Sequence, residues 1–261
     1  MTSRYSTFVS LHEGSTLLLL PNAWDAASAQ VLERQGYRAI ATSSAAVAQS
    51  LGYADGEDMP FTDYLFVIRR IAAATPLPLT VDLEMGYGRT ADAIFANVAA
   101  LATLGVVGIN LEDSQVTADG RVLQDAQVFA EKLGLLRDKL LAAQIDLFIN
   151  VRCDTYFLDV SDKQAATLRR AALYAAAGAD GLFLPGIRAA ADIAVVVDHC
   201  PLPINVMALP GLADVRTLQE LGVKRVSMGP FLFEQVYREL GLLSEQIRQR
   251  VDVQVLFGET V

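Results

Sequence analysis

The fold of this chain is decided by two apolar runs that end in acidic residues. They are Pro78-Leu79-Thr80-Val81-Asp82-Leu83-Glu84-Met85-Gly86-Tyr87-Gly88 and Val107-Gly108-Ile109-Asn110-Leu111-Glu112-Asp113. Asp82 and Glu84 are two residues apart, so on an extended strand they project from the same face. With Glu112, they place three carboxylates at strand ends, which indicates a site for a hard divalent cation such as Mg²⁺. The alternative is that these acids cap helices or are solvated.

Apolar runs of strand length alternate with longer amphipathic segments along the chain, which is typical of βα repeats around a parallel sheet. No linker or low-complexity tract divides the sequence. We therefore expect residues 1–261 to form one α/β domain, a (β/α)₈ TIM barrel, with an open doubly wound sheet as the alternative. The predicted strands are Leu17–Pro21, Arg38–Thr42, Leu79–Glu84, Val106–Glu112, Leu147–Arg152, Gly181–Pro185, Ile204–Ala208 and Arg225–Met228.

Helical patterns fill the gaps between these strands. Two more helices, Phe231–Leu240 and Ser244–Val251, are predicted after the eighth strand and form a C-terminal extension from about residue 231. Their large apolar side chains are costly to leave in water, so we expect them to pack either on their own barrel or on another subunit. The helices predicted between strands are Asp25–Gln35, Thr62–Ala74, Ala91–Leu104, Asp125–Ala143, Asp162–Ala177, Ala190–Val197 and Ala213–Leu221.

Composition and charge narrow the class of partner. The chain is 52% hydrophobic and 20% charged, which is typical of a globular protein. Its formal net charge of −9 argues against nucleic acid and anionic membranes, but not against a small anionic substrate, because a metal and a few arginines reverse the local field. Cys153 and Cys200 form neither a disulfide framework nor a zinc motif, and no signal or membrane-spanning stretch is evident, so we expect a cytoplasmic protein.

The strand-end motifs resemble those of the isocitrate lyase / phosphoenolpyruvate mutase superfamily, and the match runs over most of the chain. Its most specific part is D-x-E-x-G-Y-G at residues 82–88 followed by I-N-x-E-D at residues 109–113. The resemblance implies a magnesium-dependent barrel enzyme, with Mn²⁺ as an alternative, that makes or breaks a C–C or C–P bond next to a 2-oxo acid. It also implies a homodimer or homotetramer with a C-terminal helix swapped between subunits.

The resemblance also implies roles for individual residues. Asp82 would bind the metal directly, while Glu84 and Glu112 would act partly through water. Asp55 would face the metal waters or the substrate, although its acidic surroundings also suit a solvated turn. Arg152 would hold the substrate carboxylate, and the alternative is an ion pair with a neighbouring acid.

Further candidates line the same predicted strand ends. Tyr87 is a candidate acid or gate. Cys153 alternates with Arg152 along its strand, so we expect an inert thiol that faces the helices. The only histidines, His12 and His199, lie away from the strand ends, which argues against histidine-based chemistry. The expected substrate-binding residues are Trp24, Ser43, Ser44, Asn205 and Ser227.

One loop departs from the superfamily pattern. Lyases that cleave isocitrate or 2-methylisocitrate carry a K-[KR]-C-G-H loop after the E-D strand, whereas residues 113–121 contain no cysteine, histidine or lysine. The pattern is closest to short-loop members, which include oxaloacetate decarboxylases. We therefore expect a Mg²⁺-dependent lyase or decarboxylase that acts on an oxaloacetate-like 2-oxo acid through a metal-stabilised enolate. The alternatives are a phosphonomutase or phosphonopyruvate hydrolase, and a weakly catalytic relative that binds 2-oxo acids.

Overall fold

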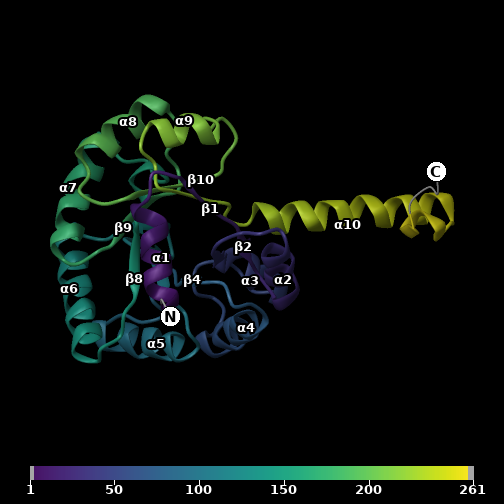
Figure 1. Cartoon of the computed structure of the whole chain (residues 1–261), viewed down its shortest axis with the longest axis horizontal. Coiled ribbons are helices and arrows are strands. Elements are labelled where there is room, and N and C mark those ends of the chain that lie inside the picture. Colours follow the sequence, from purple (N-terminus) through teal and green to yellow (C-terminus); the bar gives the residue numbers. More distant parts are fainter. Residues whose placement is uncertain (1–2, 258–261) are drawn as a thin grey trace.

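A computed structural model describes residues 3–257, and its parallel strands form the expected (β/α)₈ barrel (Figure 1). Around the barrel the order is β1-β11-β10-β9-β8-β5-β4-β3-β2. The strands are β1 (Leu18–Leu20), β2 (Asn22–Ala23), β3 (Ile40–Thr42), β4 (Leu79–Asp82), β5 (Gly108–Glu112), β8 (Phe148–Arg152), β9 (Gly181–Leu184), β10 (Ile204–Met207) and β11 (Arg225–Ser227).

The first predicted strand closes the barrel in two pieces. Pro21 has no N–H group and separates β1, which pairs with β11, from β2, which pairs with β3. The Pro21 carbonyl oxygen still accepts a hydrogen bond from the Ala41 N–H at 2.9 Å. The expected strand over Leu17–Pro21 is therefore divided at Pro21. One piece pairs with the last strand of the sheet and the other with β3, which closes the barrel.

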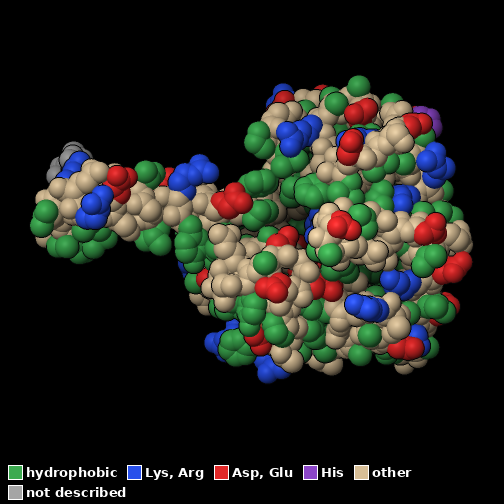
Figure 2. Space-filling model, turned by 180° about the vertical axis from the view of Figure 1, so that it is seen from behind, with side chains coloured by type: hydrophobic (Ala, Val, Ile, Leu, Met, Phe, Trp, Pro, Cys, Tyr) green, Lys and Arg blue, Asp and Glu red, His purple; other side chains and the backbone are tan. Residues whose placement is uncertain are grey.

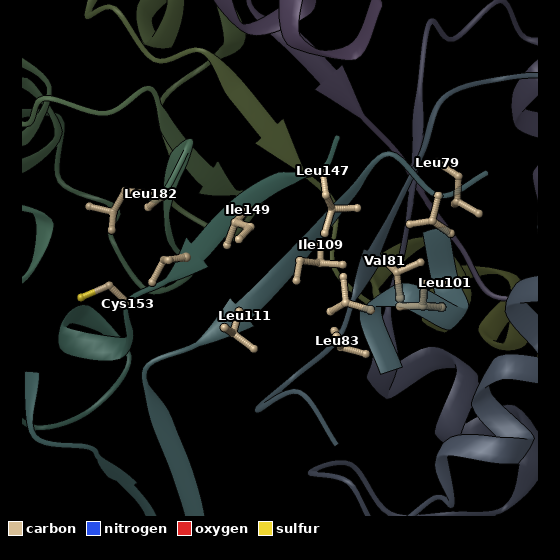
Figure 3. Close-up of a cluster of buried hydrophobic side chains, with 14 of the residues drawn as sticks. Leu79, Val81, Leu83, Leu101, Ile109, Leu111, Leu147, Ile149, Cys153 and Leu182 are labelled. Carbon is tan, nitrogen blue, oxygen red and sulfur yellow. The ribbon is translucent and has the colours of Figure 1, made fainter. Parts of the chain in front are cut away.

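Alternate residues of the strands face opposite sides of the barrel wall. Val81, Ile109 and Ile149 are paired across β4, β5 and β8, and they pack outward against the helices (Figure 3). One position further on, Asp82 is paired with Asn110 and points inward. This alternation places the apolar core between sheet and helices and leaves polar side chains inside the barrel.

Most connecting helices match the sequence prediction to within a few residues. The two helices expected after β11 are one continuous helix, because Gly241 costs only about 1 kcal/mol relative to Ala inside a helix. The first helix and the third were not predicted. The helices are α1 (Arg4–Glu13), α2 (Ala26–Arg34), α3 (Ser44–Leu51), α4 (Phe61–Ala74), α5 (Ala91–Thr103), α6 (Ala126–Ala142), α7 (Lys163–Ala176), α8 (Ala190–His199), α9 (Val215–Glu220) and α10 (Phe231–Arg250), with short 3₁₀ turns at Asp154–Tyr156 and Gln254–Phe257.

Helix α1 covers the amino end of the barrel. Phe8 and Leu11 are buried with Val107 and Phe148, which lie where β5 and β8 begin. Near the C-terminal end of the described chain, α10 projects away from the barrel as an isolated arm (Figure 1). Within residues 3–257, no helix is long and apolar enough to cross a membrane.

A hairpin follows β5 where the sequence predicted only a short loop. Strands β6 (Ser114–Thr117) and β7 (Gly120–Leu123) pair antiparallel, and Gly120 has the positive φ of +113° that the turn requires. A Cβ atom on Gly56 would lie only 3.1 Å from the Val116 side chain, so the hairpin packs against the loop after α3.

Candidate active site

A cavity of about 190 Å³ opens among the carboxyl ends of the barrel strands. Its polar lining includes Ser43, Ser44, Asp55, Asp82 and Arg152. Residues within or just after β8, β9, β10 and β11 complete the lining, among them Phe183 of β9 and Met207 of β10. The cavity therefore lies where the active sites of (β/α)₈ barrels are found.

The Asp82 carboxylate is held by two neighbouring elements. One oxygen accepts hydrogen bonds from the Ser44 hydroxyl at 2.8 Å and the Ser44 N–H at 3.3 Å, and the other accepts from the Asn110 amide at 3.2 Å. The backbone is fixed as well, because Tyr64 donates to the Asp82 carbonyl oxygen at 2.8 Å. The orientation of this carboxylate is thus set before any ligand binds.

Helix α3 begins beside Asp82. The Ser43 hydroxyl caps the helix by accepting from the Ala46 N–H at 3.3 Å, so the positive end of the helix dipole faces the carboxylate. Ser43 and Ser44, both expected to bind the substrate, line the cavity, and the Ser44 N–H and hydroxyl donate to Asp82.

Glu84 does not continue the strand, so the expectation that it projects with Asp82 from one strand face is wrong. Strand β4 ends at Asp82, and Glu84 has a left-handed backbone with φ of 52°. Its side chain is 1% exposed, and burial followed by repulsion from Asp55, Asp82 and Glu112 raises its pKa to about 9. Its Oε2 atom has no hydrogen-bond partner among residues 3–257.

Tyr87 supports Glu84 from a neighbouring cavity. Its hydroxyl donates to Glu84 Oε1 at 3.2 Å, and its N–H donates to Glu57 at 2.6 Å. Burial and the charge of Glu84 raise the pKa of the Tyr87 hydroxyl. Tyr87 lines a separate cavity of about 760 Å³ beside the β6–β7 hairpin and is not among the residues that line the cavity next to Asp82.

Glu112 lies at the centre of a buried ion-pair cluster. It is 1% exposed, pairs with Arg152 at 2.5 Å and is also bound by Arg121 from β7. Burial raises the pKa of Glu112 to about 7, although both arginines oppose the shift. Arg152 also donates to Asp154 at 2.7 Å, so the ion pairs considered as the alternative for Arg152 do form, and Arg152 still lines the cavity.

The remaining predicted residues divide between the cavity and its surroundings. Asp55 lines the cavity, where desolvation and the charge of Asp82 raise its pKa. Ser227 also lines it. Asn205 lies deeper in the barrel and donates to Ser227 at 3.2 Å, while Trp24 packs edge-on against Phe233 of α10 at 5.4 Å. Trp24 and Asn205 are therefore not walls of this cavity.

The thiol and imidazole groups lie away from the cavity, as predicted. Cys153 is fully buried among Leu111 and Leu182 on the helix-facing side of β8 (Figure 3), and burial raises the pKa of its thiol. His12 is buried in α1 at the amino end of the barrel, and His199 ends α8.

A divalent metal fits this donor set only if water completes the coordination. Among residues 3–257, no three His, Cys, Asp or Glu side chains lie close enough together to ligate one ion directly. Asp82 as a direct ligand, with Glu84 and Glu112 reached through water, suits Mg²⁺, which usually keeps several waters. The orphaned Glu84 oxygen and the mutual repulsion that raises its pKa both fit a nearby cation.

Two contacts in this cluster were missed at the sequence level. Arg121 reaches Glu112 only because the hairpin folds back, and Asp119-Gly120 between Val116 and Val122 is the turn signal that predicts such a hairpin. Asn110 belongs to the I-N-x-E-D motif, but its contact with Asp82 was not predicted. Its strand register opposite Asp82 shows the role.

Comparisons with known proteins agree with the strand-end resemblance. The family model described as phosphoenolpyruvate phosphomutase matches residues 8–248. An uncharacterized protein of Mycobacterium tuberculosis (strain CDC 1551 / Oshkosh) is 36% identical over 225 residues, which cover 85% of this chain and 81% of that protein. An oxaloacetate decarboxylase of Pseudomonas paraeruginosa (strain DSM 24068 / PA7) is 28% identical over 228 residues, covering 85% and 77%. A crystal structure described as a "putative phosphonomutase" from Burkholderia cenocepacia J2315 has a TM-score of 0.88 at 39% identity and covers 93% of this chain and 98% of that one.

Proposed function

Because this chain belongs to the phosphoenolpyruvate phosphomutase family, we propose that it is an enzyme that cleaves a C–C bond next to a small 2-oxo acid, through the enolate. One observation carries the proposal: an oriented carboxylate, Asp82, and a guanidinium, Arg152, line the same cavity at the carboxyl end of the barrel. The similarity to an oxaloacetate decarboxylase supports decarboxylation as the simplest reaction of this class.

We propose Mg²⁺ as the cofactor, with Mn²⁺ as a substitute. Asp82 would hold the ion, and Glu84, Glu112 and Asp55 would face its waters. Bound there, the ion would supply Lewis-acid polarisation of the substrate carbonyl. The charges of Asp55, Asp82 and Glu112 add to the effect of burial in raising the pKa of Glu84, which supports a cation shared by these acids.

The protein's own groups suit the charge that develops during decarboxylation. When the C–C bond to the departing CO₂ breaks, its electron pair becomes the enolate, and a proton from solvent then completes the product. Arg152 and the amino end of α3 would stabilise that negative charge electrostatically. We assign Tyr87 to holding Glu84 instead of proton transfer, because it lines the neighbouring cavity.

The test is turnover of oxaloacetate, measured as pyruvate release, with purified protein and MgCl₂. We expect a rate clearly above the background from MgCl₂ alone, abolished by EDTA and by Asp82→Ala. A rate equal to that background for both oxaloacetate and phosphonopyruvate would overturn the enzymatic proposal and favour a protein that only binds 2-oxo acids.

Phosphonate chemistry is the second candidate. It is favoured by the 39% identity to the protein described as a phosphonomutase. Incubation with phosphonopyruvate, followed by ³¹P NMR, distinguishes the products: phosphoenolpyruvate indicates a mutase and inorganic phosphate a hydrolase. Isocitrate and 2-methylisocitrate should react negligibly, because the β6–β7 hairpin carries Arg121 where those lyases carry a cysteine loop.

We also propose that α10 docks on a second copy of the chain, in a dimer or tetramer. Only Phe233 of this helix is buried, whereas Val236, Tyr237, Leu240 and Leu242 are each about half exposed. Hydrophobic side chains are exposed along the projecting arm (Figure 2). Light scattering at micromolar concentration should give a dimer or larger mass, and Leu240→Asp should lower it, whereas a monomeric wild type would refute the proposal.

A further inference from the structure

The wall of the active-site cavity opposite Asp82 is apolar. It is built by the second half of the chain, at and beyond the ends of β8, β9, β10 and β11. This side is lined by Phe157, Phe183, Pro185, Met207, Pro230 and Phe231. Because β10 lies opposite β4 in the strand order of the barrel, Met207 stands across the cavity from Asp82.

The packing of this wall is specific. Phe183 lies on the strand next to Arg152, in register with it, so the apolar wall begins directly beside the guanidinium. Gly229 also lines the cavity and lies against Met207: a Cβ atom there would stand 2.8 Å from the Met207 sulfur. Only glycine at this position, with φ of +54°, leaves Met207 its place in the wall.

None of the six side chains of this apolar wall can donate a hydrogen bond to a second carboxylate. Among the described residues that line the cavity, Arg152 is the only cation, and it is already paired with Glu112 and Asp154. The Ser227 hydroxyl donates to the Val206 carbonyl oxygen at 3.4 Å. A carboxylate placed against this wall would lose its hydration without gaining a partner, whereas an alkyl group would gain by leaving water.

We propose that the substrate of this enzyme carries an apolar group, alkyl or aryl, on the carbon next to the carbonyl, and that Phe183, Met207 and Phe231 select it. The oxo-acid end would lie against Asp82 and Arg152. This inference rests on the proposed function and narrows its substrate: oxaloacetate itself becomes the minimal member of a series in which 3-alkyl substitution improves binding.

Calorimetric titration in MgCl₂ with four probes tests this inference separately from the proposed function. Oxalate and pyruvate have no apolar tail, so oxalate reports on the charged side of the cavity alone. The other two are 5-methyl-2-oxohexanoate and 2-oxoglutarate, which differ by an isopropyl group in place of a carboxylate of similar shape. We expect oxalate to bind, and the isopropyl compound to bind at least about tenfold more tightly than 2-oxoglutarate and more tightly than pyruvate.

Each outcome decides a different claim. If oxalate fails to bind, the proposed function is overturned, and this inference falls with it. If oxalate binds but 2-oxoglutarate binds as tightly as the isopropyl compound, or neither binds more tightly than pyruvate, only the apolar specificity is overturned.

Met207→Lys provides a second measurement, with Met207→Leu as the matched control. Met207 is partly exposed, so a lysine there can keep its stem in the wall and present its charge to the cavity. We expect the lysine variant to bind 2-oxoglutarate about tenfold more tightly than wild type and to lose the preference for the isopropyl tail, while the leucine variant keeps it. An unchanged preference in a lysine variant with a wild-type melting temperature would overturn the assignment of Met207.

Discussion

The two ends of the barrel differ in the partners that they provide for buried charged side chains. At the carboxyl end, Glu112 is buried with two arginine partners, and the cluster adjoins an open cavity. At the amino end, Arg225 is buried without an acidic partner among residues 3–257; it donates to Asn110 at 3.3 Å, and burial lowers its pKa to about 9. Helix α1 covers this end, and its His12 lies between Phe8 and Phe148.

This difference predicts how the two ends respond to mutation. Charges beside the cavity can exchange one partner for a ligand, so their removal should affect catalysis most. Charged groups under α1 do not adjoin the cavity and cannot exchange a partner for a ligand. Substitutions there should therefore alter stability and leave activity unchanged. Barrel enzymes in general show this division between the two ends.

The largest effect should come from Asp82→Ala. The change removes the proposed metal-holding carboxylate, which Ser44 and Asn110 orient, so we expect kcat/KM to fall by at least about 10³-fold. Asp92→Ala is the control, because that carboxylate is 81% exposed and lies outside the cavity. Retention of more than a tenth of the wild-type kcat/KM would remove Asp82 from the proposed mechanism.

Arg152 should contribute to both activity and stability. Arg152→Lys keeps the charge but loses the planar fork, so kcat/KM should fall about 10²-fold. Arg152→Met leaves Glu112 and Asp154 buried without this partner, which should also lower the unfolding free energy by about 3–5 kcal/mol. In urea titrations, the control Arg137→Met, which breaks a half-buried pair with Asp180, should lose stability but keep full activity.

The amino end should show its effect in the pH dependence of stability. Burial, and then the charge of Arg225, lower the pKa of His12 to about 4 from an ordinary value of 6.5. The folded state thus favours neutral His12, so its contribution is complete above pH 6.5 and is lost as the pH falls toward 4. The loss approaches about 3 kcal/mol, at 1.4 kcal/mol per pH unit.

His12→Phe isolates this contribution from that of the carboxylates. Between pH 7.5 and 4.5, the unfolding free energy of wild type should fall by about 2–3 kcal/mol more than that of the variant, while their kcat/KM values at pH 7.5 agree within about twofold. Parallel pH profiles would show that His12 is not held neutral.

Cys153→Ser should have the smallest effect. It extends the comparison to two adjacent residues, Arg152 and Cys153, on opposite faces of one strand end. Cys153 follows Arg152 but faces the core, so the variant should keep kcat/KM within about twofold and lose about 1 kcal/mol of stability. A tenfold loss of activity in a fully stable variant would mean that the two faces of β8 are not independent.

Much of this arrangement could be predicted from local sequence. The βα alternation predicted the barrel, and Gly36, Gly105, Gly178 and Gly222, which follow helices, all have the left-handed φ expected there. The placement of Cys153 followed from strand alternation alone. Helix α1 was missed because nothing in its residues indicates which surface it covers, and its burial depends on Phe148, far along the chain.

The sequence by itself determined the barrel, the acids at its carboxyl end and the family, because strand periodicity and contiguous motifs are local properties of the chain. Only the tertiary structure decided which groups meet. Arg121 reaches Glu112 through the hairpin, Asp82 is oriented by α3, and Phe183 and Met207 face Asp82 across one cavity. Those contacts depend on strand register and loop folding between distant segments, which no local pattern encodes.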